Sequence, residues 1–137
     1  MKIEMSPIGY IDSPYKVLEE IPRQSVLAKD KTAIIKILPQ YIEGIEGIKK
    51  DTYGIILFYF HKATGDIPLK QILRNTNKLT GLFNTRSPKR PNGIGMSIVK
   101  FINVEIDQLE IEGVDMLDGT PVLDIKPYKT ALNPEEI

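Results

Sequence analysis

The strongest constraint on the fold is a strict alternation of apolar and polar residues in the last third of the chain. It runs from Ile102 to Glu112 in two segments that meet near Asp107 and Gln108. Alternation with a period of two is typical of strands with one buried and one exposed face, here joined by a tight turn. No sustained helical periodicity competes with this pattern elsewhere, so the chain is expected to be built from strands.

Several other segments read as short strands. These are residues 3–11, residues 32–38, the continuous apolar run 54–60, which predicts a strand buried on both faces, and residues 121–126; residues 40–49 predict a short helix. Ten Gly and ten Pro are scattered between them, which suits many turns. The chain is therefore expected to be mainly β. A small β-barrel with short helical connections is favoured because closure removes exposed strand edges.

Composition excludes several classes of protein. The 137 residues suit one domain; they contain no Cys and one His, so disulfides, zinc–thiolate sites, iron–sulfur clusters and multi-histidine metal sites are excluded and no metal is expected. No apolar stretch reaches the ~18 residues that span a bilayer, and no signal peptide is visible, so a cytoplasmic protein without a membrane partner is expected. P-loop and dinucleotide-binding motifs are absent, which argues against a Rossmann-like methyltransferase.

Charge is balanced overall but unevenly placed. The chain has 18 Lys+Arg and 18 Asp+Glu, and residues 101–137 are acidic. Two explanations of the basic central third stay open: it folds against that acidic part, or it forms a site for phosphate or RNA backbone. The basic residues in 61–100, opposed only by Asp66, are Lys62, Lys70, Arg74, Lys78, Arg86, Lys89, Arg90 and Lys100.

The most unusual segment is Thr85–Ser97, which combines cations, prolines and glycines. Prolines stiffen a loop and lower the entropy cost of presenting its side chains. Arg86 and Arg90 offer planar donors for carboxylate or phosphate, whereas Gly93 and Gly95 let a ligand approach the backbone. The segment predicts an anion-binding loop.

Three shorter segments mean little alone. They are the proline-set basic turn Pro22-Arg23-Gln24, the pair His61-Lys62 at the end of an apolar strand, and the turn Leu117–Pro121. In order along the chain, these segments lie within a longer series: residues 7–15, 22–24, 57–62, 85–97 and 117–128. On this series the chain resembles the TsaA-like family of small β-barrel proteins, which includes TrmO-type tRNA methyltransferases. The resemblance runs over nearly the whole chain.

The resemblance implies an S-adenosylmethionine-dependent methyltransferase that modifies N6 of threonylcarbamoyladenosine beside the anticodon of tRNA, and a homodimer with the cofactor near the subunit interface. RNA contacts are expected at Lys89 and Arg90, with Lys70, Arg74 and Lys78 as outlying contacts. His61 and Asp118 are both candidates for the proton acceptor. Carried over by motif, the cofactor contacts are Pro22, Arg23, Gln24, His61, Lys62, Arg86, Met96, Leu117, Asp118, Gly119 and Thr120.

The sequence departs from the family pattern in three places. Gly93 stands where a proline is usual, which is expected to loosen the loop, and Asn84 stands where a small alanine is common. The chain also ends at Ile137, so residues 1–137 are expected to form one TsaA-like domain without the additional C-terminal RNA-binding domain of longer members. Two alternatives therefore stay open: an S-adenosylmethionine-binding barrel acting on a small molecule or another RNA, or a non-enzymatic ligand-sensing module.

Overall fold

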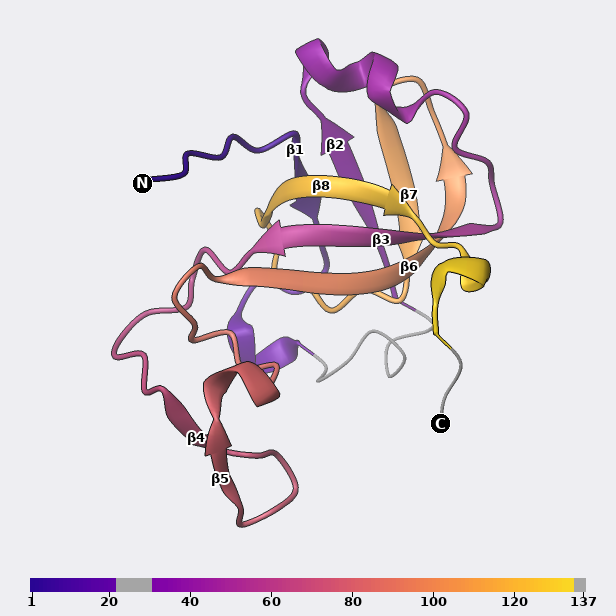
Figure 1. Cartoon of the computed structure of the whole chain (residues 1–137). Coiled ribbons are helices and arrows are strands. Elements are labelled where there is room, and N and C mark those ends of the chain that lie inside the picture. Colours follow the sequence, from indigo (N-terminus) through magenta and orange to yellow (C-terminus); the bar gives the residue numbers. More distant parts are fainter. Residues whose placement is uncertain (22–30, 135–137) are drawn as a thin grey trace.

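The computed structural model describes residues 1–21 and 31–134. Six strands form a closed ring of antiparallel hydrogen-bonded pairs in the order β1-β2-β7-β6-β3-β8 (Figure 1). The mainly β prediction is confirmed. The strands are β1 (Gly9–Asp12), β2 (Thr32–Ile37), β3 (Thr52–Tyr59), β4 (Lys70–Ile72), β5 (Leu79–Gly81), β6 (Ile94–Val104), β7 (Gln108–Glu112) and β8 (Pro121–Pro127).

Short 3₁₀ helices connect the strands, as the sequence predicts. They are η1 (Leu18–Glu20), η3 (Pro39–Ile45), η4 (Leu82–Asn84) and η5 (Thr130–Leu132). The helix expected over 40–49 is thus a 3₁₀ helix that ends at Ile45, just before Gly47, whose φ of 92° lies in the left-handed region. No helix in the described part of the chain is long and apolar enough to cross a membrane.

The core fills the interior of the ring. Alternate residues of β6 and β7 point inward, and Val99, Phe101, Leu109 and Ile111 are almost completely buried. The prediction that the two segments between Ile102 and Glu112 pair as neighbouring strands through a short turn is confirmed. The predicted burial holds for Leu109 and Ile111 only: Ile102 and Val104 are half-buried and Ile106 is 84% exposed, because the register shifts between Phe101 and Asn103.

Strand β3 differs from its prediction. Ile56 and Phe58 are buried, but Leu57 is only half-buried and Tyr59 is exposed. Its inner face packs in the ring, whereas its outer face is open to solvent, so the prediction of burial on both faces was wrong. A continuous apolar run does not distinguish a strand covered on both faces from one whose outer face is an apolar surface.

Gly95 on β6 makes room for two aromatic rings. A Cβ at this position would lie 2.5 Å from the Phe58 ring and 2.8 Å from the Phe60 ring, which pack edge to face with centroids 5.2 Å apart. The glycine is therefore explained by ring packing at the end of β3, beside the functional residues described below.

Two further segments differ from expectation. Of the strand expected over residues 3–11, only the last part forms, since β1 begins at Gly9. Pro7 has no N–H to donate to a neighbouring strand, which is consistent with a strand that begins after it. The hairpin of β4 and β5 is not predicted by the sequence at all: each strand has three residues, too few for alternation to be visible.

Candidate functional site

The turn Leu117–Thr120 is tied by backbone hydrogen bonds to β1 and to the segment that follows β1. The Asp118 N–H donates to the Tyr15 carbonyl at 2.7 Å, and the Gly119 N–H donates to the Ile11 carbonyl at 2.8 Å. Thr120 Oγ1 donates to the Leu117 carbonyl at 2.6 Å, which closes the turn from within. Leu117 and Thr120 are buried, so this turn presents Asp118 and the exposed Gly119 to ligands.

Asp118 is anchored by the segment that follows β1. The Ser13 N–H donates to Asp118 Oδ1 at 2.9 Å, and Lys16 Nζ lies 3.2 Å from Asp118 Oδ2. The Ser13 bond is the largest cause of a lowered pKa of Asp118; burial opposes it, and Lys16 adds to it. The carboxylate is therefore ionised at neutral pH and holds two chain segments together.

His61 follows the end of β3 and faces the turn. A Cβ on Gly119, whose φ is 79°, would lie 3.8 Å from His61 Nε2. The structure thus brings together two segments far apart in the sequence. Desolvation, and next the charge of Lys62, lower the pKa of His61 below its ordinary value of 6.5, although the hydrogen bond with the Tyr59 backbone opposes them. The half-buried imidazole is mostly neutral at pH 7 and able to accept a proton.

The loop between η4 and β6 is folded around Arg90. The Arg90 Nη1 donates to the carbonyls of Thr85 at 3.1 Å and Ser87 at 2.9 Å. The Gly93 N–H donates back to the Arg90 carbonyl at 3.2 Å, and the Phe60 N–H donates to the Gly93 carbonyl at 2.8 Å. Arg90 therefore stabilises its own loop, and the loop is joined to the segment that carries His61.

Gly93 has a conformation that the usual proline cannot adopt. Its φ is 55°, whereas proline is restricted to about −65°, and proline has no N–H for the Arg90 carbonyl. A Cβ here would also lie 3.0 Å from the Tyr59 ring. The departure from the family pattern gives this chain a tight, buried turn at Gly93.

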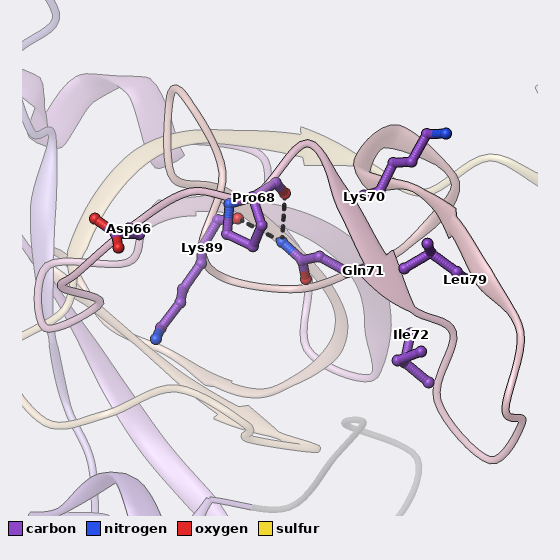
Figure 2. Close-up of a pocket in the computed structure, with 7 residues that line it drawn as sticks. All are labelled: Asp66, Pro68, Lys70, Gln71, Ile72, Leu79 and Lys89. Atoms are coloured by element: carbon purple, nitrogen blue, oxygen red, sulfur yellow. Dashed lines mark hydrogen bonds between the residues drawn. The ribbon is translucent and has the colours of Figure 1, made fainter.

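Lys89 is placed between two clefts. One lies between residues 59–67 and 88–93, where Lys89 Nζ is 3.7 Å from the position a Cβ of Gly65 would take. The other, shown in Figure 2, lies beside β4 and includes Asp66 and Gln71. Lys89 is exposed, so its ammonium group is available to an anion.

The remaining predicted residues are more dispersed. Met96 is 45% exposed on the outer face of β6, opposite Leu57 of β3, and so points away from the interior of the ring. Arg86 is exposed in the loop before Arg90, and Lys62 is exposed next to His61. Pro22, Arg23 and Gln24 lie outside the described residues.

Ser13 and Lys16 were not identified as site residues from the sequence. Ser13 Oγ donates to the Met116 carbonyl at 2.7 Å and accepts the Tyr15 N–H at 3.0 Å, so it fixes the segment beside the turn. The signal available was the turn Ser13-Pro14-Tyr15, but nothing in a sequence shows that it lies against residues 116–118.

The ion pairs distinguish the two explanations of the basic central third. In residues 1–21 and 31–134, none of the cations from Lys62 to Arg90 pairs with an acidic side chain. The C-terminal acids Asp118 and Asp124 pair instead with Lys16 and Lys126. Lys100, the last cation of the basic central third, pairs with Asp51. Among the described residues, the acidic C-terminal part therefore does not neutralise the basic central third through ion pairs.

The arrangement offers a neutral imidazole, an anchored carboxylate and cations that have no acidic partner among residues 1–21 and 31–134. These groups suit a ligand that carries a carboxylate and polar hydroxyls. In the part of the chain that the structure describes, no cluster of three or more His, Asp or Glu side chains is placed to hold a metal ion.

Comparisons with known proteins show to which proteins this chain is similar. Residues 10–133 match the model of the tRNA-methyltransferase O N-terminal domain. An S-adenosyl-L-methionine-binding protein of Archaeoglobus fulgidus is 36% identical over 94% of this chain and 91% of its own length. A mouse tRNA (adenine(37)-N6)-methyltransferase is 41% identical over 89% of this chain and 30% of its own length.

A solved structure extends the likeness to the fold. The crystal structure of TrmO from Pseudomonas aeruginosa superposes with a TM-score of 0.81 at 39% identity, covering 96% of this chain and 58% of that one. The chain spans 55% and 58% of the length of two curated Pseudomonas aeruginosa relatives. It belongs to the family of the tRNA-methyltransferase O N-terminal domain.

Proposed function

We propose that this chain is an S-adenosylmethionine-dependent tRNA methyltransferase that modifies N6 of threonylcarbamoyladenosine beside the anticodon. The observation that carries this proposal is the family match over residues 10–133, whose segments include both His61 and the turn Leu117–Thr120. Its support in the structure is that these two segments meet, with His61 Nε2 close to Gly119.

S-adenosylmethionine, when bound, supplies an electrophilic methyl group and its own leaving group. We assign its binding to the segments carried over by family: Pro22 to Gln24, His61 with Lys62, Arg86, Met96, and Leu117 to Thr120. Arg86 suits the carboxylate because its guanidinium is exposed and has no acidic partner in the described part of the chain. The Asp118 N–H is donated to Tyr15 and the Gly119 N–H to Ile11 of β1. The carbonyls of Leu117 and Thr120 accept hydrogen bonds from Thr120 and Ile11, so the backbone groups that we assign to the ligand are the carbonyls of Asp118 and Gly119.

The chain's part in the reaction is to hold the acceptor nitrogen in line with the methyl group at about 3 Å, and positioning of this kind supplies roughly 7–11 kcal/mol. We assign the proton acceptor to His61. Its lowered pKa keeps it neutral at pH 7, whereas both oxygens of Asp118 are engaged by Ser13 and Lys16. Asp118 then keeps the turn in place.

We further propose that the closed ring is the TsaA-like β-barrel of residues 1–137 and that two copies form a homodimer through its outer face. Tyr59, Ile94 and Met96 are 41–45% exposed on neighbouring positions of β3 and β6, which leaves an apolar surface for a second copy. This arrangement gives the outward-facing Met96 a route to a cofactor near the subunit interface.

The test is incubation with methyl-labelled S-adenosylmethionine and tRNA, followed by digestion to nucleosides. Label in threonylcarbamoyladenosine from the anticodon loop is expected. Transfer to another nucleoside, or to a small molecule only, would replace the proposed substrate.

A second candidate is a ligand-sensing module that binds S-adenosylmethionine without turnover. The name of the Archaeoglobus fulgidus relative, an S-adenosyl-L-methionine-binding protein, favours it. Calorimetric binding of S-adenosylmethionine with no label in any tRNA would select this candidate.

A further inference from the structure

The hairpin of β4 and β5 is separate from the closed ring. Its two strands form their own two-stranded sheet, and Figure 1 shows it extending away from the ring at the end opposite η3. Ile72 pairs with Leu79, and both are 59% exposed. Because this sheet buries few of its side chains in the core, it is an element that presents a surface rather than one that stabilises the ring.

One face of the hairpin is held against the anion-binding loop. Gln71 Nε2 donates to the Pro68 carbonyl at 3.2 Å and to the Lys89 carbonyl at 3.3 Å, the two dashed contacts in Figure 2. The Leu82 N–H donates to the Leu69 carbonyl at 2.8 Å, which closes the base of the hairpin. These contacts fix the hairpin beside Lys89.

The hairpin carries three exposed cations: Lys70 shares the face opposite Gln71 with Ile72 and Leu79, and Arg74 and Lys78 lie at the tip. No Asp or Glu occurs anywhere between Ile67 and Val104. The ion pairs in the described part of the chain use Lys16, Lys36, Lys100 and Lys126. The hairpin cations and the neighbouring loop lysine are all exposed and none has an acidic partner there: Lys70, Arg74, Lys78 and Lys89.

We infer that the β4–β5 hairpin is an RNA-binding arm, in which Lys70, Arg74 and Lys78 hold phosphates and Gln71 keeps the arm in register with the loop of Lys89. This inference rests on the proposed function and adds to it a second contact surface, outside the cofactor segments. A polyanion is favoured because Lys70, Arg74 and Lys78 are exposed and have no acidic partner in the described part of the chain. Leu69, Ile72, Leu79 and Phe83 are also exposed on or beside the hairpin, so an apolar protein partner is the alternative that the test must separate.

The experiment compares the wild type with two variants that lose the same number of positive charges. They are the hairpin variant Lys70→Gln/Arg74→Gln/Lys78→Gln and the control variant Lys2→Gln/Lys49→Gln/Lys50→Gln, whose three lysines are also exposed and lie outside the site. For each protein, tRNA affinity is measured at several salt concentrations, S-adenosylmethionine affinity by calorimetry, and thermal unfolding by circular dichroism.

We expect the hairpin variant to bind tRNA at least about tenfold more weakly, with a slope of log affinity against log salt reduced by roughly 2–3, because each lost phosphate contact removes about 0.9. Its S-adenosylmethionine affinity and melting temperature stay at the wild-type values. The control variant changes tRNA affinity less than about threefold. Equal losses in the two variants, or no loss in the hairpin variant, would overturn the inference.

Failure of the inference and failure of the proposed function give different results. If the wild type methylates tRNA but the hairpin variant binds tRNA with normal affinity, the proposed function stands and the hairpin is not an RNA-binding arm. If the wild type transfers no methyl group, the function fails whatever the hairpin does. A variant Ile72→Ser/Leu79→Ser that changes the mass in light scattering, with tRNA affinity retained, would assign the hairpin to a second copy of the chain and overturn the inference.

Discussion

The turn around Asp118 and the β4–β5 hairpin differ in how their charged side chains are held. Beside β1, Asp118 is held by Ser13 and Lys16, and the turn around it is bonded to β1 through its backbone. On the hairpin, Lys70, Arg74 and Lys78 are exposed and have no acidic partner among the described residues. A carboxylate held by a hydrogen bond and an ion pair fixes the shape of the turn, which suits a small ligand. Exposed cations without an acidic partner among the described residues present charge, which suits a polyanion.

Replacing His61 by Ala is expected to have the largest effect on catalysis. Loss of a positioned proton acceptor lowers methyl transfer by roughly 100-fold or more, while tRNA affinity is retained because the imidazole is mostly neutral at pH 7. Single-turnover transfer with labelled cofactor measures the rate. A rate within a few-fold of wild type would remove His61 from the reaction.

The pH dependence of the wild type sharpens this assignment. The folded pKa of His61 lies below 6.5, so more than half of the imidazole is neutral at pH 6.5, and activity falls only as pH drops through that lowered pKa. The rate at pH 6.5 is therefore expected to exceed half of its plateau value. A midpoint above pH 6.5 would contradict the assignment.

Arg86→Ala tests whether Arg86, an exposed cation near the hairpin, binds the cofactor or the tRNA. Loss of a charge-assisted contact with the cofactor carboxylate is expected to weaken S-adenosylmethionine binding roughly 10- to 100-fold. Calorimetry measures it, with Lys50→Ala as a control at an exposed position away from the site. Unchanged cofactor affinity combined with weaker tRNA binding would move Arg86 to the RNA surface.

Gln71→Met keeps every cation and removes both hydrogen bonds of the Gln71 amide. We expect tRNA affinity to fall by roughly 3- to 10-fold, in line with one or two modest hydrogen bonds, while cofactor affinity and melting temperature stay unchanged. Gln71→Asn, which keeps an amide, serves as the conservative comparison and is expected to recover part of the affinity. No change with Met would show that the arm needs no anchor.

Asp118→Asn is expected to have the smallest effect. The amide oxygen still accepts the Ser13 N–H, but the ion pair with the exposed Lys16 is lost, at a cost of about 1 kcal/mol or less. Because the folded pKa of Asp118 lies below 3.8, the carboxylate's contribution is present above that pH and disappears as pH falls through the folded pKa. Denaturant unfolding of the wild type and the variant is measured from pH 7 downward through acid pH. The loss is expected to shrink once the pH falls below 3.8, and a loss that stays constant over the whole range would contradict the account.

Local patterns predicted the strands of the ring and missed what depends on distant contacts. The alternation from Ile102 to Glu112 predicted that the end of β6 pairs with β7, because a period of two is a local signal, but it did not predict residues 94–101 of β6. The contact between His61 and Gly119 could not be predicted from local patterns, because the two residues are far apart in the sequence and meet only when the ring of strands closes. The role of Arg90 was also unpredictable: a cation that bonds its own loop's carbonyls looks the same in sequence as one presented to RNA.

The most direct test of the contrast is a crossed binding measurement on His61→Ala and the hairpin variant, with S-adenosylmethionine and tRNA as ligands. The hairpin variant is expected to lose tRNA affinity at least about tenfold with its cofactor affinity unchanged, and His61→Ala to keep tRNA affinity within about threefold of wild type. If the hairpin variant loses cofactor affinity as strongly as tRNA affinity, the two regions form one site and the division of roles proposed for them is wrong.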